Sequence, residues 1–327
     1  MKELNTSIII VNWNGLKHLK VCFNSIFTQS YKDFEIIFVD NGSTDGSVSF
    51  VRENFSAVKI IKLEKNYGFA EGNNIGIREA LKNKEIRYII ALNNDTEVTP
   101  DWLENLIQTT KSDDTIGAVA SKTLFFNQRD IIDSAGDFLL HNTFKVIARG
   151  YQERDNVQYG KIEECFSARA AACLYKREML EDIKMNNDFF DSKYFVYIED
   201  TDLSIRARLN GWKIVYNPRA VVYHKVATTS SQIAHEFRRY YSGRNRIFTA
   251  IKNYPIRFWL TALKGRESVD ADYKISTVKS IIIYIKIFFS TLLSLPRLIS
   301  QRKCIQKNKK ISTSEIYGWI NRFSIKK

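Results

Sequence analysis

Along the first third of the chain, short runs of apolar residues alternate with segments whose apolar positions recur every three or four residues. The runs have the length of buried strands, and the intervening segments have the period of amphipathic helices. We expect strands at residues 7–11, 34–39, 58–63 and 88–92, and helices at residues 18–27, 47–54 and 71–81. Nearly continuous apolar strands separated by helices predict an α/β fold, with a parallel sheet covered by helices on both faces.

The pattern becomes less regular after this region. Residues 117–161 contain strand-like pieces between glycines, and the pattern leaves their topology open. A helix at residues 202–209 and a strand at residues 213–216 are expected after an acidic loop. We place a domain boundary near Pro255, which separates a larger domain, residues 1–254, from a helical and basic region, residues 255–327.

The positive charge of the chain is concentrated at its C-terminal end. The net charge is +13, and residues 238–327 contain 20 Lys or Arg against 4 Asp or Glu, whereas residues 1–237 contain 29 against 32. This distribution favours an anionic partner surface. The four cysteines form no C-x-x-C pair, and the apolar run at residues 7–11 is too short for a signal peptide. We therefore expect a cytoplasmic protein.

The basic region contains an apolar and aromatic stretch at residues 275–298, which Lys279 and Lys286 interrupt and which Pro296 is expected to end. A charge at the bilayer centre costs about 2.5 to 3.5 kcal/mol. We therefore favour an amphipathic helix lying on the inner face of the cell membrane over a transmembrane helix. The basic run at residues 302–310 would add attraction to anionic lipid. A helix packed on the larger domain is the alternative, and binding of nucleic acid by this region is not expected.

Polar motifs follow several predicted strands, at the positions where open α/β sheets bind ligands. Asp40 begins the run DNGSTDGS, and its carboxylate can accept hydrogen bonds from a base or a ribose. Asn41 and Ser43 would also form a turn and a helix cap without any ligand. The run NYGFAEGNNIG at residues 66–76 combines asparagines with closely spaced glycines, which allow a backbone to approach a ligand. It lacks the dinucleotide-binding glycine pattern.

Two further motifs contain the acidic residues best suited to catalysis. Asp95, in the run LNNDTEV, has a carboxylate of the kind that binds Mg2+ or Mn2+. Residues 199–202 place three carboxylates in four positions between apolar neighbours, so we expect their repulsion to raise at least one pKa. His224 follows the apolar run AVVY and is either a buried core histidine or a metal ligand.

In this order the motifs resemble those of glycosyltransferase family 2, particularly its bacterial branch of rhamnosyltransferases and related enzymes of cell-surface polysaccharide assembly. The matching runs are IIIVNWNG at 8–15, VDNGSTDGS at 39–47, NYGFAEGNNIG at 66–76, LNNDTEV at 92–98, FVYIEDTDLSIRARLNGWKIVYNP at 195–218 and VVYH at 221–224. The resemblance extends from about residue 6 to about residue 250. It implies a GT-A fold, the Rossmann-like α/β fold of nucleotide-diphospho-sugar transferases, for residues 1–254.

The resemblance assigns the first two motifs to a nucleotide-sugar donor. Asp40 would hold the base or the ribose, with Asn12 and Asn66 beside it. Asn73 would also lie at the donor, although relatives often carry Arg at this position. The arginines of the run YYSGRNR at residues 240–246 would supply positive charge near the diphosphate in its place, or would contact a membrane.

The resemblance places a metal at the third motif. Asn93, Asn94 and Asp95 stand at the D-x-D motif of the family, so they would contact the donor, and Asp95 would bind Mg2+ or Mn2+ on its diphosphate. His224 would complete the metal's ligands. Asn93 replaces the first Asp of this motif, so the site carries one negative charge fewer and is expected to hold metal mainly together with the donor.

The resemblance also names the residue that activates the acceptor. Asp200 matches the general base, and Glu199 is the fallback. The expected reaction is the inverting, metal-dependent transfer of a sugar from a UDP- or dTDP-sugar to a hydroxyl of a glycan or a lipid-linked glycan. A non-catalytic subunit that binds sugar nucleotides or glycans on the same fold is the alternative. A nicotinamide oxidoreductase would share the strand–helix alternation, but its glycine pattern is missing.

Overall fold

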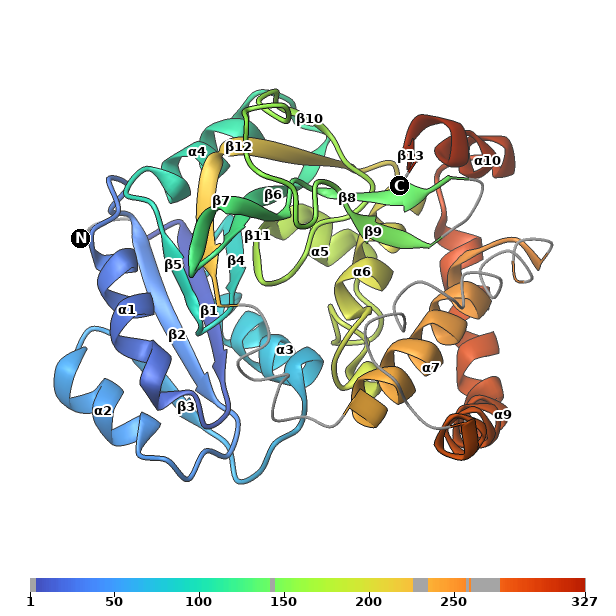
Figure 1. The fold of residues 1–327 in the computed structure, drawn as a ribbon, viewed down its shortest axis with the longest axis horizontal. Coiled ribbons are helices and arrows are strands. Elements are labelled where there is room, and N and C mark those ends of the chain that lie inside the picture. The colour runs from blue at the N-terminus through green and yellow to red at the C-terminus, as the bar shows by residue number, and fades with distance from the viewer. Residues whose placement is uncertain (1–3, 142–144, 226–234, 257–258, 260–276, 327) are drawn as a thin grey trace.

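The computed structural model describes residues 4–141, 145–225, 235–256, 259 and 277–326 (Figure 1). The strands are β1 (Thr6–Asn12), β2 (Phe34–Asp40), β3 (Lys59–Lys62), β4 (Tyr88–Leu92), β5 (Thr96–Val98), β6 (Ile116–Phe125), β7 (Gln128–Ser134), β8 (Asp137–Leu140), β9 (Val146–Ala148), β10 (Glu163–Glu164), β11 (Ala172–Lys176), β12 (Lys213–His224) and β13 (Ser324–Ile325). The helices are α1 (Leu16–Phe27), α2 (Ser47–Asn54), α3 (Phe69–Ala80), α4 (Trp102–Lys111), α5 (Arg177–Ile183), the 3-10 turn η1 (Ser192–Tyr194), α6 (Glu199–Leu209), α7 (His235–Asn253), α9 (Thr277–Asn308) and α10 (Thr313–Arg322).

A ten-stranded sheet forms the centre of the fold, in the order β10-β12-β6-β11-β4-β1-β2-β3 along its main path. β3, β2, β1 and β4 are parallel, so the predicted α/β arrangement of the first third of the chain is confirmed. β11 was not predicted, and it enters between β4 and β6 antiparallel to both. Because β1, β2 and β4 run in the same direction, the loops after Asn12, Asp40 and Leu92 emerge at one edge of the sheet.

Helices cover both faces of the sheet, and the alternation of side chains along each strand gives each face its own core. In β1, Ile8 and Ile10 pack with α1, α2 and α4, whereas Ile9 packs with α3, α5 and α6. Figure 1 shows α1 and α3 on opposite sides of β1. Burying each of these isoleucines contributes about 1.5 to 3 kcal/mol, so the two cores together fix the strand ends that carry the polar motifs.

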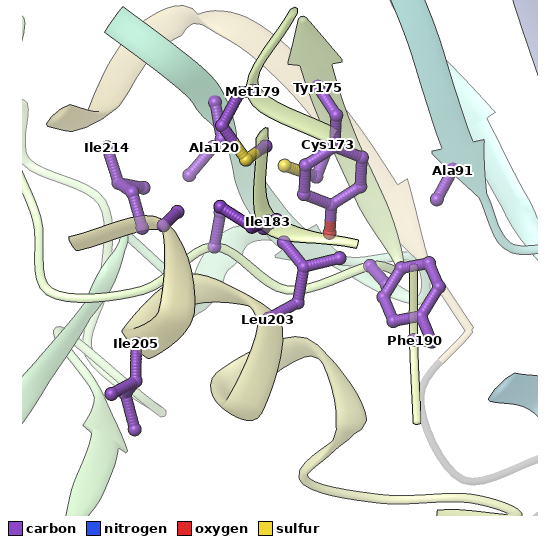
Figure 2. Close-up of a cluster of buried hydrophobic side chains, with 14 of the residues drawn as sticks. Ala91, Ala120, Cys173, Tyr175, Met179, Ile183, Phe190, Leu203, Ile205 and Ile214 are labelled. Atoms are coloured by element: carbon purple, nitrogen blue, oxygen red, sulfur yellow. The ribbon is translucent and has the colours of Figure 1, made fainter. Parts of the chain in front are cut away.

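α6 is surrounded by protein on nearly every side instead of presenting one apolar stripe. Leu203 lies in the same buried cluster as Tyr175 and Phe190 (Figure 2). Arg206 and Arg208 are also buried, and each donates hydrogen bonds at 2.7 Å to a backbone carbonyl, of Ile183 and Phe166 respectively. These contacts hold the axis of α6 and therefore the acidic residues at its first turn.

The C-terminal region packs against the sheet domain. α7 and α9 lie side by side (Figure 1). Trp319 and Phe323 join the core cluster that contains α3, α5 and α6, and β13 pairs with β8 in a second, three-stranded sheet. The boundary near Pro255 stays a prediction, since residues 257–258 and 260–276 lie outside the described part of the chain.

α9 is one helix of 32 residues with Pro296 inside it, so the prediction that Pro296 ends the helix is wrong. Proline disfavours a helix interior, but Leu298 and Ile305, on the following turns, are buried and hold the helix in place. Other positions along α9 expose large apolar side chains: Val278, Ile281, Ile282, Ile285, Phe288, Phe289, Leu292, Leu293 and Ile299. α9 is long and apolar enough to cross a membrane. Length and composition alone do not show that it does, because buried helices of soluble proteins meet the same criterion.

Candidate active site

Side-chain hydrogen bonds around Asn12 join the loops at the carboxyl ends of β1, β2 and β4. The Asn12 amide donates to Asp40 Oδ1 at 3.3 Å and to Ser43 Oγ at 3.0 Å, and its Oδ1 accepts from Asn94 Nδ2 at 2.6 Å. A Cβ at Gly15 would stand 2.1 Å from Asn94 Nδ2, so a larger residue there would displace the side chains that join these loops. Asp40 is fully buried and accepts from the Ser43 N–H at 3.1 Å. Asp40 therefore fixes the loop, and its contact with a base or ribose stays a prediction.

The second predicted donor motif folds back on the first. The Asn41 side chain donates to Asn66 Oδ1 at 3.1 Å and to the Gly68 carbonyl at 3.0 Å. Asn73 is buried in α3 and donates to the Phe69 carbonyl at 2.9 Å. The structure thus brings Asn66 next to the loop after β2, whereas the Asn73 amide is engaged within its own helix. The donor contacts of both stay predictions.

His224, at the end of β12, lies between two carboxylates. Its Nε2 is 3.3 Å from Asp95 Oδ1, and its Nδ1 is 3.3 Å from Asp133 Oδ2. The amide nitrogen of Asn93 lies 3.3 Å from the same Nε2. Burial disfavours the charged imidazole, but Asp95 and Asp133 outweigh it and raise the pKa of His224 to about 10. The residues that the D-x-D resemblance links to a metal are therefore neighbours in space.

These groups fit part of a divalent metal site. Adjacent ligands of an octahedral Mg2+ stand about 3 Å apart, close to the 3.3 Å between Asp95 and His224. Among the described residues, no group of three or more His, Cys, Asp or Glu could hold a metal ion. Two protein ligands leave most coordination positions for water or a diphosphate. Asp133 lies at the other ring nitrogen of His224, where carboxylates commonly orient a metal-bound histidine.

Asp133 and Arg169 were not identified from the sequence. Asp133 is buried in β7, inside the segment whose topology the pattern left open. Arg169 precedes β11, and its Nε donates to Asp137 at 3.0 Å while its Nη1 lies 3.5 Å from Asp133. Only the folding of β7 and β11 onto β6 brings these residues together. The one signal of this site in the sequence was the pair Asp133 and Asp137, which flank Gly136 in an otherwise apolar run.

Glu199 and Asp200, the acidic pair, form the first turn of α6, which begins three residues earlier than predicted. Asp200 is partly exposed, and it accepts from the Thr201 N–H at 2.7 Å and the Ala170 N–H at 3.1 Å. Glu199 is buried, and its Oε2 has no hydrogen-bond partner among the described residues. Burial raises the pKa of both carboxyls; the charge of Asp200 adds to the effect on Glu199, and Asp137 adds to the effect on Asp200. The expected repulsion is therefore present.

A two-residue segment connects the acidic pair with residues 93–95. The Ala170 N–H donates to Asp200, and the carbonyl of the next residue, Ala171, accepts from the Asn93 N–H at 2.8 Å. Asp200 and Asn93, two residues before Asp95, are therefore each bound by one hydrogen bond to the same short segment.

The backbone that leads into the acidic pair is strained. Phe195, Tyr197 and Ile198 have φ angles of 65°, 69° and 71°. Each such conformation costs about 1 to 3 kcal/mol for a residue other than glycine. Phe195, with ψ at −63°, is the centre of a rare type of γ-turn, which the Val196 N–H closes onto the Tyr194 carbonyl at 2.8 Å. Strain of this kind is typical of functional sites whose surroundings determine the backbone.

Asp202, the third acid of the motif, is separated from the pair. It is fully buried and accepts from Lys252 at 3.0 Å, Arg206 at 3.1 Å and Asn253 at 2.7 Å. Burial opposes its ionisation, but Lys252 and Arg206 outweigh it and lower the pKa of Asp202. Asp202 therefore stabilises the fold. Arg244 is likewise buried, and it donates to two backbone carbonyls before the acidic pair, so it is used inside the fold instead of at a diphosphate or a membrane.

The mixed α/β sheet with helices on both faces is that of the GT-A glycosyltransferase fold, as the alignments with solved structures show. Staphylococcus aureus TarS, residues 1–349, aligns with a TM-score of 0.59 and 16% identity over 98% of this chain and 89% of that one. GalNAc-T7, solved with UDP, GalNAc and Mn2+, aligns with a TM-score of 0.61 and 14% identity over 87% and 54%. Identities this low support the fold alone.

The sequence pattern of glycosyl transferase family 2 matches residues 7–184, just over half of the chain, and the chain belongs to this family. The glycosyltransferase GlyG of Streptococcus pneumoniae serotype 4 is 28% identical over 196 residues, 57% of this chain and 61% of GlyG. The match thus spans less than two thirds of this relative's length. Asp200 and His224 lie beyond the matched segment, so their roles stay predictions.

Proposed function

We propose that the chain is an inverting glycosyltransferase that moves a sugar from a nucleotide-sugar donor to a hydroxyl of a glycan or a lipid-linked glycan. The observation that carries this proposal is the position of Asp200, which Ala170 and Ala171 connect to the loop of Asn93 and Asp95. Asp200 is partly exposed, and its raised pKa makes it a stronger base than an ordinary aspartate.

In the proposed mechanism, Asp200 removes the proton of the acceptor hydroxyl while the hydroxyl oxygen bonds to the anomeric carbon of the donor. The bond from that carbon to the nucleoside diphosphate breaks in the same displacement, so the configuration inverts and the diphosphate leaves with the bonding electrons. A positioned base of this kind contributes about 10²- to 10⁴-fold. Glu199 is the fallback for this role, but it is buried. Asp95 and His224 would hold Mg2+ or Mn2+, which when bound offsets the charge of the departing diphosphate.

We propose that the donor binds at the edge formed by the loops after β1, β2 and β4, where Asn12, Asn94 and Asp40 meet and Asn66 lies alongside. Two proteins of the same fold support a nucleoside diphosphate as ligand, because TarS has been solved with UDP and GalNAc-T7 with UDP and Mn2+. The motifs resemble the rhamnosyltransferase branch, so we propose a UDP- or dTDP-sugar of the rhamnose type.

Release of nucleoside diphosphate from a panel of UDP-, dTDP- and GDP-sugars, with and without EDTA, tests this proposal. We expect turnover of a UDP- or dTDP-sugar that EDTA abolishes and that Asp200→Asn lowers at least about 100-fold. The matched control is Asp113→Asn, a half-exposed aspartate that follows α4 and pairs with Lys213. If Asp200→Asn keeps activity near that of the wild type, Asp200 is excluded as the general base. Donor binding without turnover across the panel would instead favour a non-catalytic binding subunit.

We also propose that α9 rests on an anionic membrane surface at the cytoplasmic face. Its exposed apolar side chains would enter the interface, and the exposed Lys286, Lys303 and Lys307 would each add about 1 kcal/mol against anionic lipid. Sedimentation with phosphatidylserine vesicles should fall when Phe288 and Leu293 are both changed to Glu. Val157→Glu, at an exposed apolar residue outside α9, is the control. Equal sedimentation of both variants, or binding to DNA alone, contradicts the membrane role.

A further inference from the structure

The strained backbone before the acidic pair is held by one side chain of α7. The Nδ2 group of Asn245 lies 3.0 Å from the Tyr194 carbonyl, 3.0 Å from the Val196 carbonyl and 2.8 Å from the Tyr197 carbonyl. Asn245 is fully buried, and its Oδ1 accepts from the Nε of Arg244 at 3.0 Å. The two N–H groups of one amide therefore lie within hydrogen-bonding distance of three of the four backbone carbonyls before Ile198, so the three carbonyls share two donors.

The same backbone also contacts the second donor motif. The Phe195 carbonyl accepts from the Ala70 N–H at 3.2 Å. A Cβ at Gly68 would stand 2.6 Å from that carbonyl oxygen, so Phe195 and Gly68 are in close contact. The Phe195 ring stacks on Tyr241 of α7, with centroids 5.3 Å apart. Residues 194–198 are thus held between α3 and α7, and Glu199 and Asp200 follow directly.

We propose that Asn245 is a positioning residue for the acidic pair, which it holds in place by binding the carbonyls of Tyr194, Val196 and Tyr197. A backbone of this shape persists only where its surroundings determine it. Without the amide, the carbonyls of Val196 and Tyr197 lose the hydrogen bond that each accepts from Asn245, and the backbone can relax. Relaxation rotates the first turn of α6, which carries Asp200. This inference rests on the proposed function of Asp200 as the base.

Asn245→Asp is the informative variant, because it keeps the size of the side chain and leaves no cavity but replaces the donating amide with an acceptor. Asn245→Ala removes the group entirely. The matched control is Asn217→Ala, another buried asparagine, which donates to the Asn105 carbonyl at 3.1 Å and to Thr109 at 2.7 Å, away from the acidic pair. All three variants are compared by thermal unfolding, so that loss of stability is measured separately from loss of positioning.

The first measurement is amide hydrogen exchange of the peptide covering residues 194–200, which needs no turnover. We expect exchange there to rise at least about tenfold in Asn245→Asp and Asn245→Ala and to stay unchanged in Asn217→Ala. The second is the kinetics of donor consumption. We expect kcat to fall about 10- to 100-fold, as for a misplaced catalytic group, with KM for the donor within about threefold of wild type.

Unchanged exchange at residues 194–200 in both Asn245 variants overturns the inference, whatever the activity. Raised exchange with the same kcat as the Asn217→Ala control also overturns it, since the backbone would then relax without moving the base. If the wild type consumes no nucleotide sugar, the proposed function fails, and raised exchange then supports only the structural half of the inference. A fall in kcat together with raised exchange supports it in full.

Discussion

The buried ammonium of Lys252 provides the sharpest test of how the C-terminal helices stabilise the fold. Lys252 lies on α7, is fully buried, and is 2.8 Å from Asp191 and 3.0 Å from Asp202. Asp191 precedes η1 and Asp202 lies on α6, so one cation connects three segments of the chain. Lys252→Met keeps the unbranched apolar chain and removes only the charged group. We predict that it lowers the free energy of unfolding by about 3 kcal/mol.

The magnitude follows from the charges that remain. Removing one partner of a buried ion pair costs about 3 to 5 kcal/mol, because the other charge stays buried without compensation. In Lys252→Met, Arg297 still contacts Asp191 at 2.8 Å and Arg206 still contacts Asp202 at 3.1 Å. Each carboxylate keeps one cation, so we expect the lower end of that range.

Urea unfolding, followed by tryptophan fluorescence and by far-UV circular dichroism, measures this loss. The control is Lys82→Met, an exposed lysine paired with Glu79, for which we expect less than about 1 kcal/mol. A loss in Lys252→Met no larger than in the control would refute the reasoning. Two separate transitions in the wild type would show that α7 unfolds independently of α6, which also contradicts it.

Arg169→Gln should move the acidic limb of the pH profile of kcat/KM to higher pH. Burial and Asp137 raise the pKa of Asp200 and the positive charge of Arg169 lowers it, so loss of that charge raises the pKa of Asp200 further. The urea concentration at the unfolding midpoint of the wild type should decrease once the pH is lowered beneath about 4. The pKa of Asp202 is lowered on folding, so its contribution to the free energy of unfolding is complete above the unfolded pKa of about 3.9 and is lost as the pH falls through the folded pKa. Asp95→Ala should weaken UDP or dTDP binding at least about tenfold in calorimetry with Mn2+ and have little effect without it; equal weakening in both conditions contradicts the metal role. Gly68→Ala should lower stability by about 1 to 3 kcal/mol, since φ is 91° and the new Cβ meets Phe195; an unchanged melting temperature excludes that contact.

The parts of the site that could be predicted are those determined by neighbouring residues. Asp40 ends one apolar strand and Asp95 comes three residues after another, so a run of strand-forming residues with a polar end was sufficient to place them near one edge of the sheet. The strand at Tyr88–Leu92 and the helix at Ser47–Asn54 have the predicted bounds, because each has clear ends in the sequence.

The parts that could not be predicted depend on contacts between distant residues. Asp133 meets His224 across 91 positions, and only the pairing of β6 with β7 and β12 brings them together. Ile198 has a conformation that its own side chain disfavours, so the start of α6 follows from the packing of α3 and α7 instead of local preference. Pro296 stays inside a helix for the same reason, because burial of the following turns outweighs the propensity of proline.

The pairing of β13 with β8 has a consequence for synthesis of the protein on the ribosome. Leu139 pairs with Ser324, so the β8–β9 hairpin gains its third strand only after a further 185 residues have been added. At about 5 to 20 residues per second, this takes roughly 10 to 40 s. During that interval the surface of Phe166 that Trp319 and Phe323 later cover has no partner from the C-terminal segment. The nascent chain therefore passes through a period in which chaperones can bind this surface, and aggregation competes with the last step of folding.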